Sequence, residues 1–158
     1  MSLLVVDNLQ TEFATRDGVL RAVQGVSFTL ERGQVLGLVG ESGSGKSVTG
    51  FSIMGLVDPP GRIAGGSVRF DGRELVGQPE DHWRRLRGKR IAMIFQDPMM
   101  TLNPVLSIET QMVETVLAHE RVARTEERRR AIDALGRVGI AAPESRLAQY
   151  PHQFSGGM

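Results

Sequence analysis

The sequence of 158 residues contains no cysteine and few aromatic residues, which make up 5% of the chain. Without cysteine, the chain has no disulfide, no thiolate ligand for zinc, no thiol nucleophile and no cysteine-held iron–sulfur cluster. Lysine is also scarce, because only Lys46 and Lys89 are lysines among the 19 basic residues. Any chemistry of this chain must therefore use oxygen and nitrogen groups, and each lysine is a candidate for a specific role.

Long hydrophobic runs and a large excess of one charge are absent as well. No window reaches the roughly 18 consecutive apolar residues that cross a bilayer, and the first residues lack the features of an export signal, so we expect a soluble, unexported chain. The formal net charge of +1 gives no electrostatic reason for a polyanionic partner. Basic residues cluster at 83–90 and 128–130 beside acidic ones, so we interpret both segments as solvated helix faces and expect no nucleic acid.

The composition, with 41% hydrophobic and 23% charged residues, is typical of a compact folded chain whose length suits one domain. Short apolar runs at 3–6, 19–23 and 26–30 predict consecutive β-strands that begin with hairpins. The next run, Val35–Val39, is apolar on both faces and predicts a buried strand. A glycine-rich loop follows it, and then a segment, 46–54, that can form a helix.

The pattern changes near residue 98. Before it, the apolar segment at 67–70 and the Asp-Gly turn after it predict another hairpin, a short helix is expected at 80–87, and 90–95 predicts a second buried strand. After it, apolar residues recur at helical spacing, and Thr125 is a plausible helix start with Gly139 as its stop. The helical positions are Ile108, Met112, Val113, Val116 and Leu117, and then Ala131, Ile132, Leu135 and Val138. We therefore expect a mixed α/β part followed by a helical part.

The glycine-rich loop follows the pattern glycine, four residues, glycine, lysine, and then serine or threonine. Glycines let successive backbone N–H groups curl around phosphate oxygens, and the start of the next helix adds partial positive charge. Lys46 can reach the β- and γ-phosphates, and the Ser47 hydroxyl can ligate Mg²⁺. We therefore predict a site for a nucleoside triphosphate. Its residues are Gly40, Glu41, Ser42, Gly43, Ser44, Gly45, Lys46 and Ser47.

Two further segments are compatible with the same ligand. Gln96 ends the predicted strand at 90–95, where open α/β sheets place ligands, so it can reach a metal-bound water or the γ-phosphate. An ordinary strand-end glutamine is the alternative. Ser155, Gly156 and Gly157 offer a hydroxyl and two amides, which make a second phosphate cradle if a helix follows. Linkers have the same composition, so this segment alone is a weak indication.

Together these motifs resemble those of the ATP-binding subunits of ABC transporters. Gly40–Ser47 is similar to the Walker A loop, Gln96 to the Q-loop glutamine, and Phe154–Met158 to the family signature. Segments 93–104 and 149–158 are most similar to the dipeptide, oligopeptide and nickel importer branch. A methionine at the end of the signature, in place of the usual glutamine, is typical of that branch. The resemblance covers the whole chain.

The resemblance implies an α/β fold, the P-loop NTPase core of an ABC ATPase, with an N-terminal antiparallel β-subdomain, a helical subdomain, and the C-terminal part of the sheet missing. Residues 1–98 would be the N-terminal part of the ATP-binding core, and 99–158 the helical subdomain that ends at the signature. Phe13 would stack on adenine, with a half-buried strand residue as the alternative. Val48 would join the nucleotide contacts, and Ser47 and Gln96 would hold Mg²⁺.

The resemblance also implies partners. ATP would lie between the Walker A loop of one subunit and the signature of the other, so Ser155, Gly156 and Gly157 would serve the nucleotide of a second ABC ATPase subunit, identical or related. Two transmembrane permease subunits would complete the transporter, with a solute-binding protein as an indirect partner. The chain would be cytoplasmic and peripheral on the inner face of the cell membrane. Met99, Met100 and neighbouring Leu102 would lie near the surface that receives a helix of a membrane subunit.

A complete subunit of this family continues with a strand ending in Asp-Glu and later with a switch histidine, and no residue here can be assigned to either role. His82, His119 and His152 all precede the signature, so we interpret them as surface or packing residues. We expect a full-length ATPase that energises import of peptides or nickel, whereas the 158-residue chain alone binds MgATP weakly and turns it over negligibly. The alternatives are a soluble ABC-type ATPase acting on ribosomes or DNA, and a non-catalytic nucleotide-binding fragment.

Overall fold

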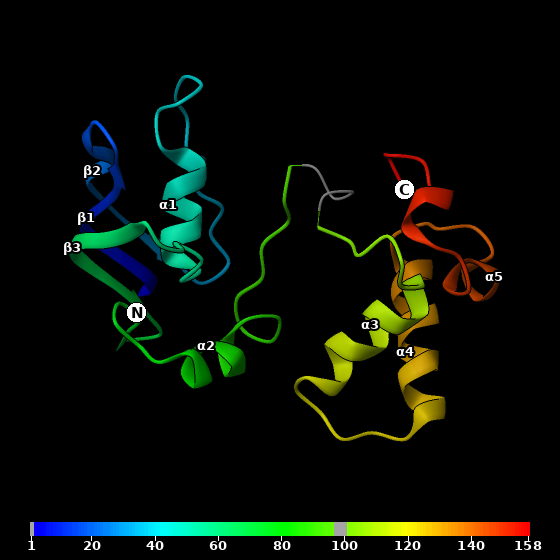
Figure 1. Cartoon of the computed structure of the whole chain (residues 1–158). Helices are drawn as coiled ribbons and strands as arrows, with labels where there is room; N and C mark the ends of the chain where they lie inside the picture. The colour runs from blue at the N-terminus through cyan, green and yellow to red at the C-terminus, as the bar shows by residue number, and fades with distance from the viewer. Residues whose placement is uncertain (1, 97–100) are drawn as a thin grey trace. The chain divides into compact units, whose positions relative to one another are not determined.

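Four strands form an antiparallel sheet in the first part of the chain (Figure 1). The computed structural model describes residues 2–96 and 101–158. The sheet has the order β2-β1-β3-β4. Its strands are β1 (Ser2–Thr15), β2 (Gly18–Glu31), β3 (Gly61–Phe70) and β4 (Arg73–Glu74). The predicted hairpins are therefore present, one between β1 and β2 and one between β3 and β4.

The runs at 19–23 and 26–30 form one strand, whereas the sequence pattern predicts two. Gly25 lies between them with φ 76°, and the register of β1 against β2 shifts beside it, so the glycine introduces a bulge and not a turn. Asn8 on β1 also has a positive φ of 48°, and a Cβ added to Gly25 would lie 2.9 Å from its Oδ1. The bulge keeps both apolar runs paired to β1.

Helix α1 (Lys46–Ile53) packs against one face of this sheet (Figure 1). The buried side of the helix carries hydroxyls, because Thr49 and Ser52 are its buried residues. Ser52 lies 2.7 Å from the hydroxyl of Thr11 on β1, and both side chains are buried. The hydrogen bond satisfies two polar groups that would otherwise be costly inside the protein, and it fixes the helix on the sheet. Apolar strand residues complete the core: Val6, Leu9, Val23 and Val68.

The predictions of buried strands at Val35–Val39 and 90–95 are wrong for this structure. Residues 34–41 have no regular structure, and Val35 and Val39 are 94% and 93% exposed. The segment 90–95 is likewise irregular apart from a single bridge residue, and Ile94 is 96% exposed. A buried strand needs hydrogen-bonded neighbours on both sides, and none of the described strands lies beside either segment.

The chain divides into two compact units, Met1–Trp83 and Arg84–Met158. Helix α2 (Glu80–Leu86) spans the division between the two units, and it is the short helix that the sequence predicts at 80–87. The boundary that the sequence suggests near residue 98 falls in 97–100, outside the described residues, as do Met99 and Met100, so it stays a prediction. No helix among the described residues combines the length and the apolar character needed to cross a bilayer.

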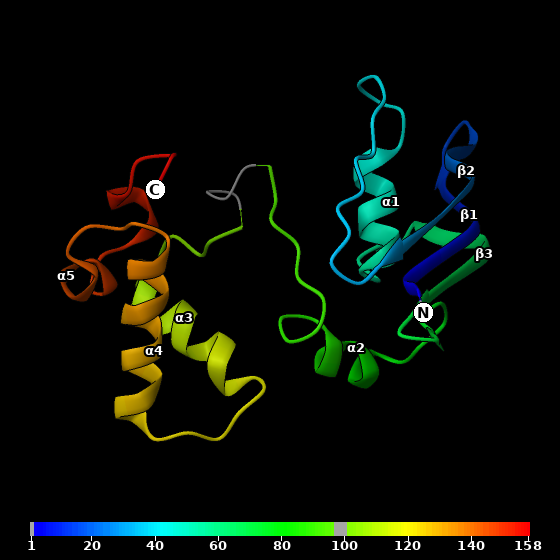
Figure 2. The same ribbon diagram turned by 180° about the vertical axis from the view of Figure 1, so that it is seen from behind.

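The second unit is helical (Figures 1 and 2). It contains α3 (Ile108–Leu117), α4 (Arg124–Arg137), α5 (Pro143–Leu147) and the 3₁₀ helix η2 (Pro151–Gln153). Helix α4 begins after Ala123, so Thr125 is not its N-cap as expected but lies in its first turn. Gly139, with φ 79°, follows the end of α4 as predicted. The core of this unit is Ile108, Ala131, Leu135, Ile140 and Leu147.

Candidate nucleotide-binding site

The loop before α1 closes around the ammonium group of Lys46. Its Nζ donates hydrogen bonds to the carbonyl oxygens of Gly40 and Glu41 at 2.9 and 2.7 Å, and lies 3.4 Å from the Ser44 hydroxyl. The lysine thus ties the first residues of the loop to the start of the helix. The loop thus holds one cation, Lys46, beside one exposed acid, Glu41, and the cation is the charge that a phosphate chain would need.

The same loop also contains free backbone donors. Among the described residues, no acceptor is assigned to the N–H groups of Gly43, Gly45, Lys46 and Ser47. The last three are at the N-terminus of α1, where the first N–H groups of a helix have no partner in the helix itself. The positive end of the helix dipole therefore points into the loop together with free donors, which is the arrangement that binds anions.

Gly45 has a specific structural role in this geometry. It caps α1 with φ 88° in the left-handed region, and a Cβ at this position would lie 2.3 Å from the carbonyl oxygen of Ala22 on β2. Only glycine satisfies both conditions. The sheet therefore supports the loop from beneath, a contact that the sequence pattern could not show because Ala22 is distant in the chain.

The hydroxyls of α1 provide the second contribution that motif reasoning missed. Thr49 donates to the carbonyl of Gly45 at 2.9 Å and is 3% exposed, and Ser52 donates to the carbonyl of Val48 at 2.7 Å. These bonds anchor the first turn of the helix, on which Ser47 remains exposed with its hydroxyl free for a ligand. The sequence does carry one signal for this contribution: Thr49 and Ser52 are three positions apart, so their hydroxyls lie on one face of the helix.

Phe13 lies at the end of β1 with its ring against β3. A Cβ on Gly61 would be 2.5 Å from the Phe13 ring and 2.8 Å from the Val57 side chain, so the three residues are packed together. The ring is half-buried. Stacking on adenine therefore stays a prediction, and the packing of the ring on Gly61 is what the structure describes.

The remaining predicted site residues belong to the second unit. Gln96 is exposed and follows an irregular segment, and Ser155, Gly156 and Gly157 are exposed in the last turn, where the Met158 N–H donates to the Ser155 carbonyl at 2.9 Å. Their approach to a nucleotide stays a prediction. The amides of the two glycines have no described acceptor and can receive an anion from outside the chain.

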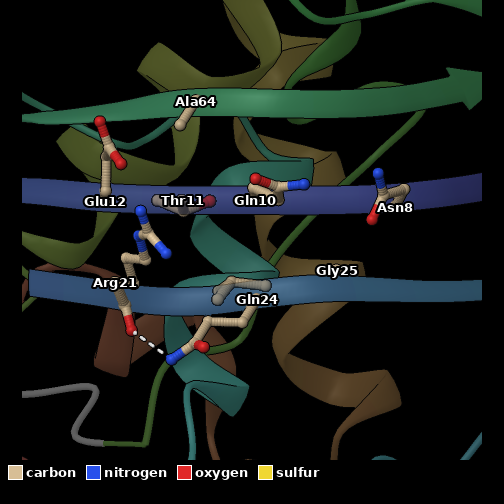
Figure 3. Close-up of a pocket in the computed structure, with 9 residues that line it drawn as sticks. Asn8, Gln10, Thr11, Glu12, Arg21, Gln24, Gly25 and Ala64 are labelled. Atoms are coloured by element: carbon tan, nitrogen blue, oxygen red, sulfur yellow. Dashed lines mark hydrogen bonds between the residues drawn. The ribbon is translucent and has the colours of Figure 1, made fainter.

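A separate polar hollow of about 250 Å³ lies on the sheet near the bulge (Figure 3). Side chains from β1 and β2 line it, and Gln24 donates to the Arg21 carbonyl at 3.2 Å. Glu12 pairs with Arg62 at its border, so its charge is already compensated. None of the predicted nucleotide-binding residues lines this hollow.

The fold and the loop together define a P-loop nucleotide-binding protein, because a glycine loop with free amides and a central lysine precedes a helix that packs on the sheet. A family model narrows this class. The chain belongs to the ABC transporter family, because the model of that family matches residues 23–158.

Individual relatives cover the whole chain. It is 47% identical over 158 residues to the dipeptide transport ATP-binding protein DppD of Escherichia coli, covering 100% of this chain and 48% of that protein. It is 46% identical over 157 residues to the oligopeptide transport ATP-binding protein OppD of Bacillus subtilis, covering 99% of this chain and 44% of that protein. The chain thus spans about half the length of the curated relatives it matches.

A solved structure shares the fold. The dimeric, post-hydrolysis state of an ATP-binding cassette bound to ADP and Pi superimposes with a TM-score of 0.82, at 24% identity, over 98% of this chain and 64% of that one. This similarity confirms the expected ABC ATPase type of fold. The antiparallel sheet, the loop before α1 and the helical unit are all part of the matched region.

Proposed function

We propose that this chain is part of the ATP-binding subunit of a peptide importer, and that its loop at residues 40–47 binds the triphosphate of MgATP. The observation that carries the proposal is the geometry of the loop, in which the Lys46 ammonium group is 2.7 and 2.9 Å from two loop carbonyls and the amides of residues 43, 45, 46 and 47 have no described acceptor. Relatives named for dipeptide and oligopeptide transport support the class of solute.

The residues of the chain fit this ligand. The free amides of the loop would bind phosphate oxygens, and Lys46 would neutralise charge on the β- and γ-phosphates. Ser47, whose hydroxyl is free and exposed, would hold Mg²⁺ together with Gln96. Bound Mg²⁺ supplies further charge neutralisation at the phosphates. Phe13 would contact the base, and Val48 would complete the contacts of the loop.

The partners follow from the same proposal. Ser155, Gly156 and Gly157 would contact the nucleotide held by a second ATPase subunit, and the family dimer supports this role because the matched cassette is dimeric. Two permease subunits in the membrane would couple ATP binding and hydrolysis to import, and the chain would lie on the cytoplasmic side of that membrane. The helical unit offers a groove of about 630 Å³ beside Leu102 and Met112 for such a contact.

The test is calorimetric titration of the purified protein with ATP and magnesium. Lys46→Ala is expected to weaken binding about tenfold to a hundredfold, because one charge-assisted contact contributes roughly 1.5–3 kcal/mol. Lys89→Ala is the matched control, since it removes the only other lysine. Equal affinities of the two variants would refute the site. Steady phosphate release by the 158-residue chain that Lys46→Ala abolishes would refute our expectation that this chain alone is inactive.

A further inference from the structure

Buried hydroxyl groups are concentrated where β1 meets α1 (Figure 1). Thr11 on β1 is 0% exposed, and Ser52 and Thr49 on α1 are 2% and 3% exposed. They are three of the four buried polar or charged residues in the part of the chain that the structure describes. Burying a hydroxyl costs free energy unless it is hydrogen-bonded, so the junction depends on how these groups pair.

The hydroxyl on β1 donates toward the helix. Ser52 donates its one hydroxyl proton to the carbonyl oxygen of Val48 at 2.7 Å. The hydrogen bond of 2.7 Å between the hydroxyls of Thr11 and Ser52 therefore takes its proton from Thr11. Bonding runs in one direction, from the strand through the Ser52 oxygen to a carbonyl in the first turn of α1.

Thr49 holds the other end of the same turn. Its hydroxyl donates to the carbonyl oxygen of Gly45 at 2.9 Å, and its backbone N–H donates to the same oxygen at 2.8 Å. The carbonyls of Gly45 and Val48 flank residues 46–47, which are proposed to contact phosphate and Mg²⁺. The buried hydroxyls therefore fix both ends of the segment that carries these ligand groups.

The strand pair beneath α1 places Thr11 close to the loop in space, although it is distant in sequence. Its Cα partner on β2 is Val23. The residue before Val23 is Ala22, whose carbonyl oxygen leaves no room for a Cβ on Gly45. The sheet thus supports the start of α1 through β2 and its later turn through the hydroxyl on β1. A helix held at only one of these points can shift on the sheet and carry the loop amides with it.

We propose that Thr11 is a positioning residue for phosphate binding, because its hydroxyl, through Ser52, holds the first turn of α1 in place for the triphosphate. Thr11 contributes no group to the ligand, since its hydroxyl is buried and donates to Ser52. The inference rests on the function proposed above, since it concerns the same loop. It adds that a residue of the sheet determines how tightly that loop binds.

The test is titration of the purified protein with MgATP and with magnesium tripolyphosphate, a probe that has the phosphates but no base. Thr11→Val keeps nearly the shape of the side chain and removes its hydroxyl. We expect it to weaken both ligands about three- to tenfold, the change to which the loss of one net hydrogen bond corresponds. Thr11→Ser keeps the hydroxyl and is expected to restore the binding of both ligands.

Thr15→Val is the matched control on the same strand. The Thr15 hydroxyl donates to the Gly18 carbonyl at 2.8 Å in the exposed hairpin turn, so this variant also loses one hydrogen bond of a threonine, but outside the junction with α1. It is expected to bind tripolyphosphate like the parent protein. Unchanged affinity for tripolyphosphate in Thr11→Val, or an equal loss in Thr15→Val, would overturn the proposal.

A second measurement separates positioning from stability. Loss of either hydroxyl can lower the melting temperature, so affinities are compared where circular dichroism shows every variant folded. In ¹⁵N-labelled protein without ligand, Thr11→Val is expected to shift the amide signals of residues 45–48, whereas Thr15→Val leaves them in place. If these signals are unchanged in Thr11→Val, the hydroxyl stabilises the protein without positioning the loop.

Ser52→Ala tests the other end of the hydrogen bond. It removes both the acceptor of the Thr11 proton and the donor to Val48, so it is expected to weaken tripolyphosphate at least as much as Thr11→Val. The double variant is expected to bind no more weakly than Ser52→Ala alone, because the two residues act through one contact. If Thr11→Val does not fold, Ser52→Ala decides, and a normal affinity of this variant refutes the positioning role.

Failure of the proposed function gives a different result. If the parent protein binds neither ligand, or if Lys46→Ala binds both as tightly as the parent does, the loop is not the phosphate site and both proposals are wrong. If Lys46→Ala loses affinity but Thr11→Val and Ser52→Ala do not, only the positioning role is refuted.

Discussion

Two glycines of the phosphate-binding loop have the same backbone conformation but different surroundings. Gly43 and Gly45 have φ angles of 82° and 88°, so a side chain at either position is strained. A Cβ on Gly43 would meet nothing within 4 Å, whereas one on Gly45 would lie 2.3 Å from the carbonyl oxygen of Ala22. Substitutions at the two positions can therefore distinguish the effect of backbone strain, which both share, from the effect of the contact with β2, which only Gly45 makes.

Gly45→Ala is therefore expected to reduce MgATP affinity far more than Gly43→Ala. Both variants carry the left-handed cost of about 1–2 kcal/mol. Only Gly45→Ala must also move the start of α1 away from Ala22, which displaces the free amides. Calorimetry on the two purified variants measures the difference, and thermal melts check folding. Equal losses of affinity would show that the contact with Ala22 is unimportant.

Glu74 illustrates a carboxylate whose bonds are all structural. It accepts the Ser67 hydroxyl at 2.5 Å and the backbone N–H groups of Val68, Leu75 and Val76 at 3.0, 3.2 and 3.0 Å. Partial burial raises its pKa, but the hydrogen bonds from Ser67 and from the three amides together lower it by more, so the pKa of Glu74 lies below its ordinary value of 4.5. The carboxylate thereby holds the turn between β3 and β4.

Glu74→Gln is expected to destabilise the protein by about 1–2 kcal/mol, because hydrogen bonds to a charged acceptor become bonds to a neutral one. The pKa of Glu74 is lowered on folding, so its contribution is complete above about pH 4.5 and is lost as the pH falls through the folded value. Urea denaturation at pH 7 and in acid measures this. The difference between variant and parent must shrink in acid, and a constant difference would contradict the assignment.

At the scale of elements, α4 is stabilised by charges along one surface. Glu126 bonds Arg129 at 2.8 Å and Arg130 at 2.9 Å, Arg129 also bonds Asp133 at 2.7 Å, and Arg130 bonds Glu120 at 2.8 Å. The hydrogen bonds from Arg129 and then Arg130 lower the pKa of Glu126 to about 2. The ion pair of Arg130 with Glu120 connects α4 to the segment that follows α3, whereas ion pairs between residues of one helix connect nothing outside that helix.

Glu126→Gln is expected to lower the melting temperature of the helical unit at low salt and to have little effect in about 1 M NaCl, where exposed charges are screened. The folded pKa of Glu126 lies below its ordinary value of 4.5, so its stabilisation is present above about pH 4.5 and disappears as the pH approaches 2. Circular dichroism melts measure both dependences. Glu144→Gln serves as control, and a salt-independent loss in Glu126→Gln would refute the network.

Local patterns predicted the elements whose contacts are local. The predicted helix at 46–54 is α1, the predicted loop encloses Lys46, and the apolar spacing after 108 gives α3. Val35–Val39 shows the opposite case, since its strand character depends on neighbours that no nearby residue supplies. Periodicity recognises an apolar run, but it does not show which strand pairs with it.

The nucleotide-binding site shows the same difference between contacts within a short segment, which the sequence predicts, and contacts between distant segments, which it does not. The glycine–lysine pattern identified the loop because its geometry depends on consecutive residues. The support from Ala22 and the buried pair of Thr11 and Ser52 join segments far apart in the chain, so no motif revealed them.

At the scale of the whole molecule, apolar surface is exposed where the sequence predicted burial. Val35 and Val39 are 94% and 93% exposed in one short segment, and Leu36 and Leu38 between them are 44% and 47% exposed. Contiguous apolar residues of this kind are uncommon on monomeric proteins. The segment at 35–39 is therefore a surface against which other polypeptide can pack.

The exposed segment leads to a prediction for the 158-residue chain itself. We expect it to self-associate as its concentration rises, because association removes this apolar segment from water. Val35→Thr combined with Val39→Thr is expected to weaken association about tenfold or more, since each buried valine contributes about 1.5 kcal/mol. Val105→Thr with Val138→Thr is the matched control, because these valines are 76% and 74% exposed but isolated from one another in sequence. Sedimentation velocity measures all three chains, and equal weakening by both pairs would show that general surface hydrophobicity, and not the segment at 35–39, drives association.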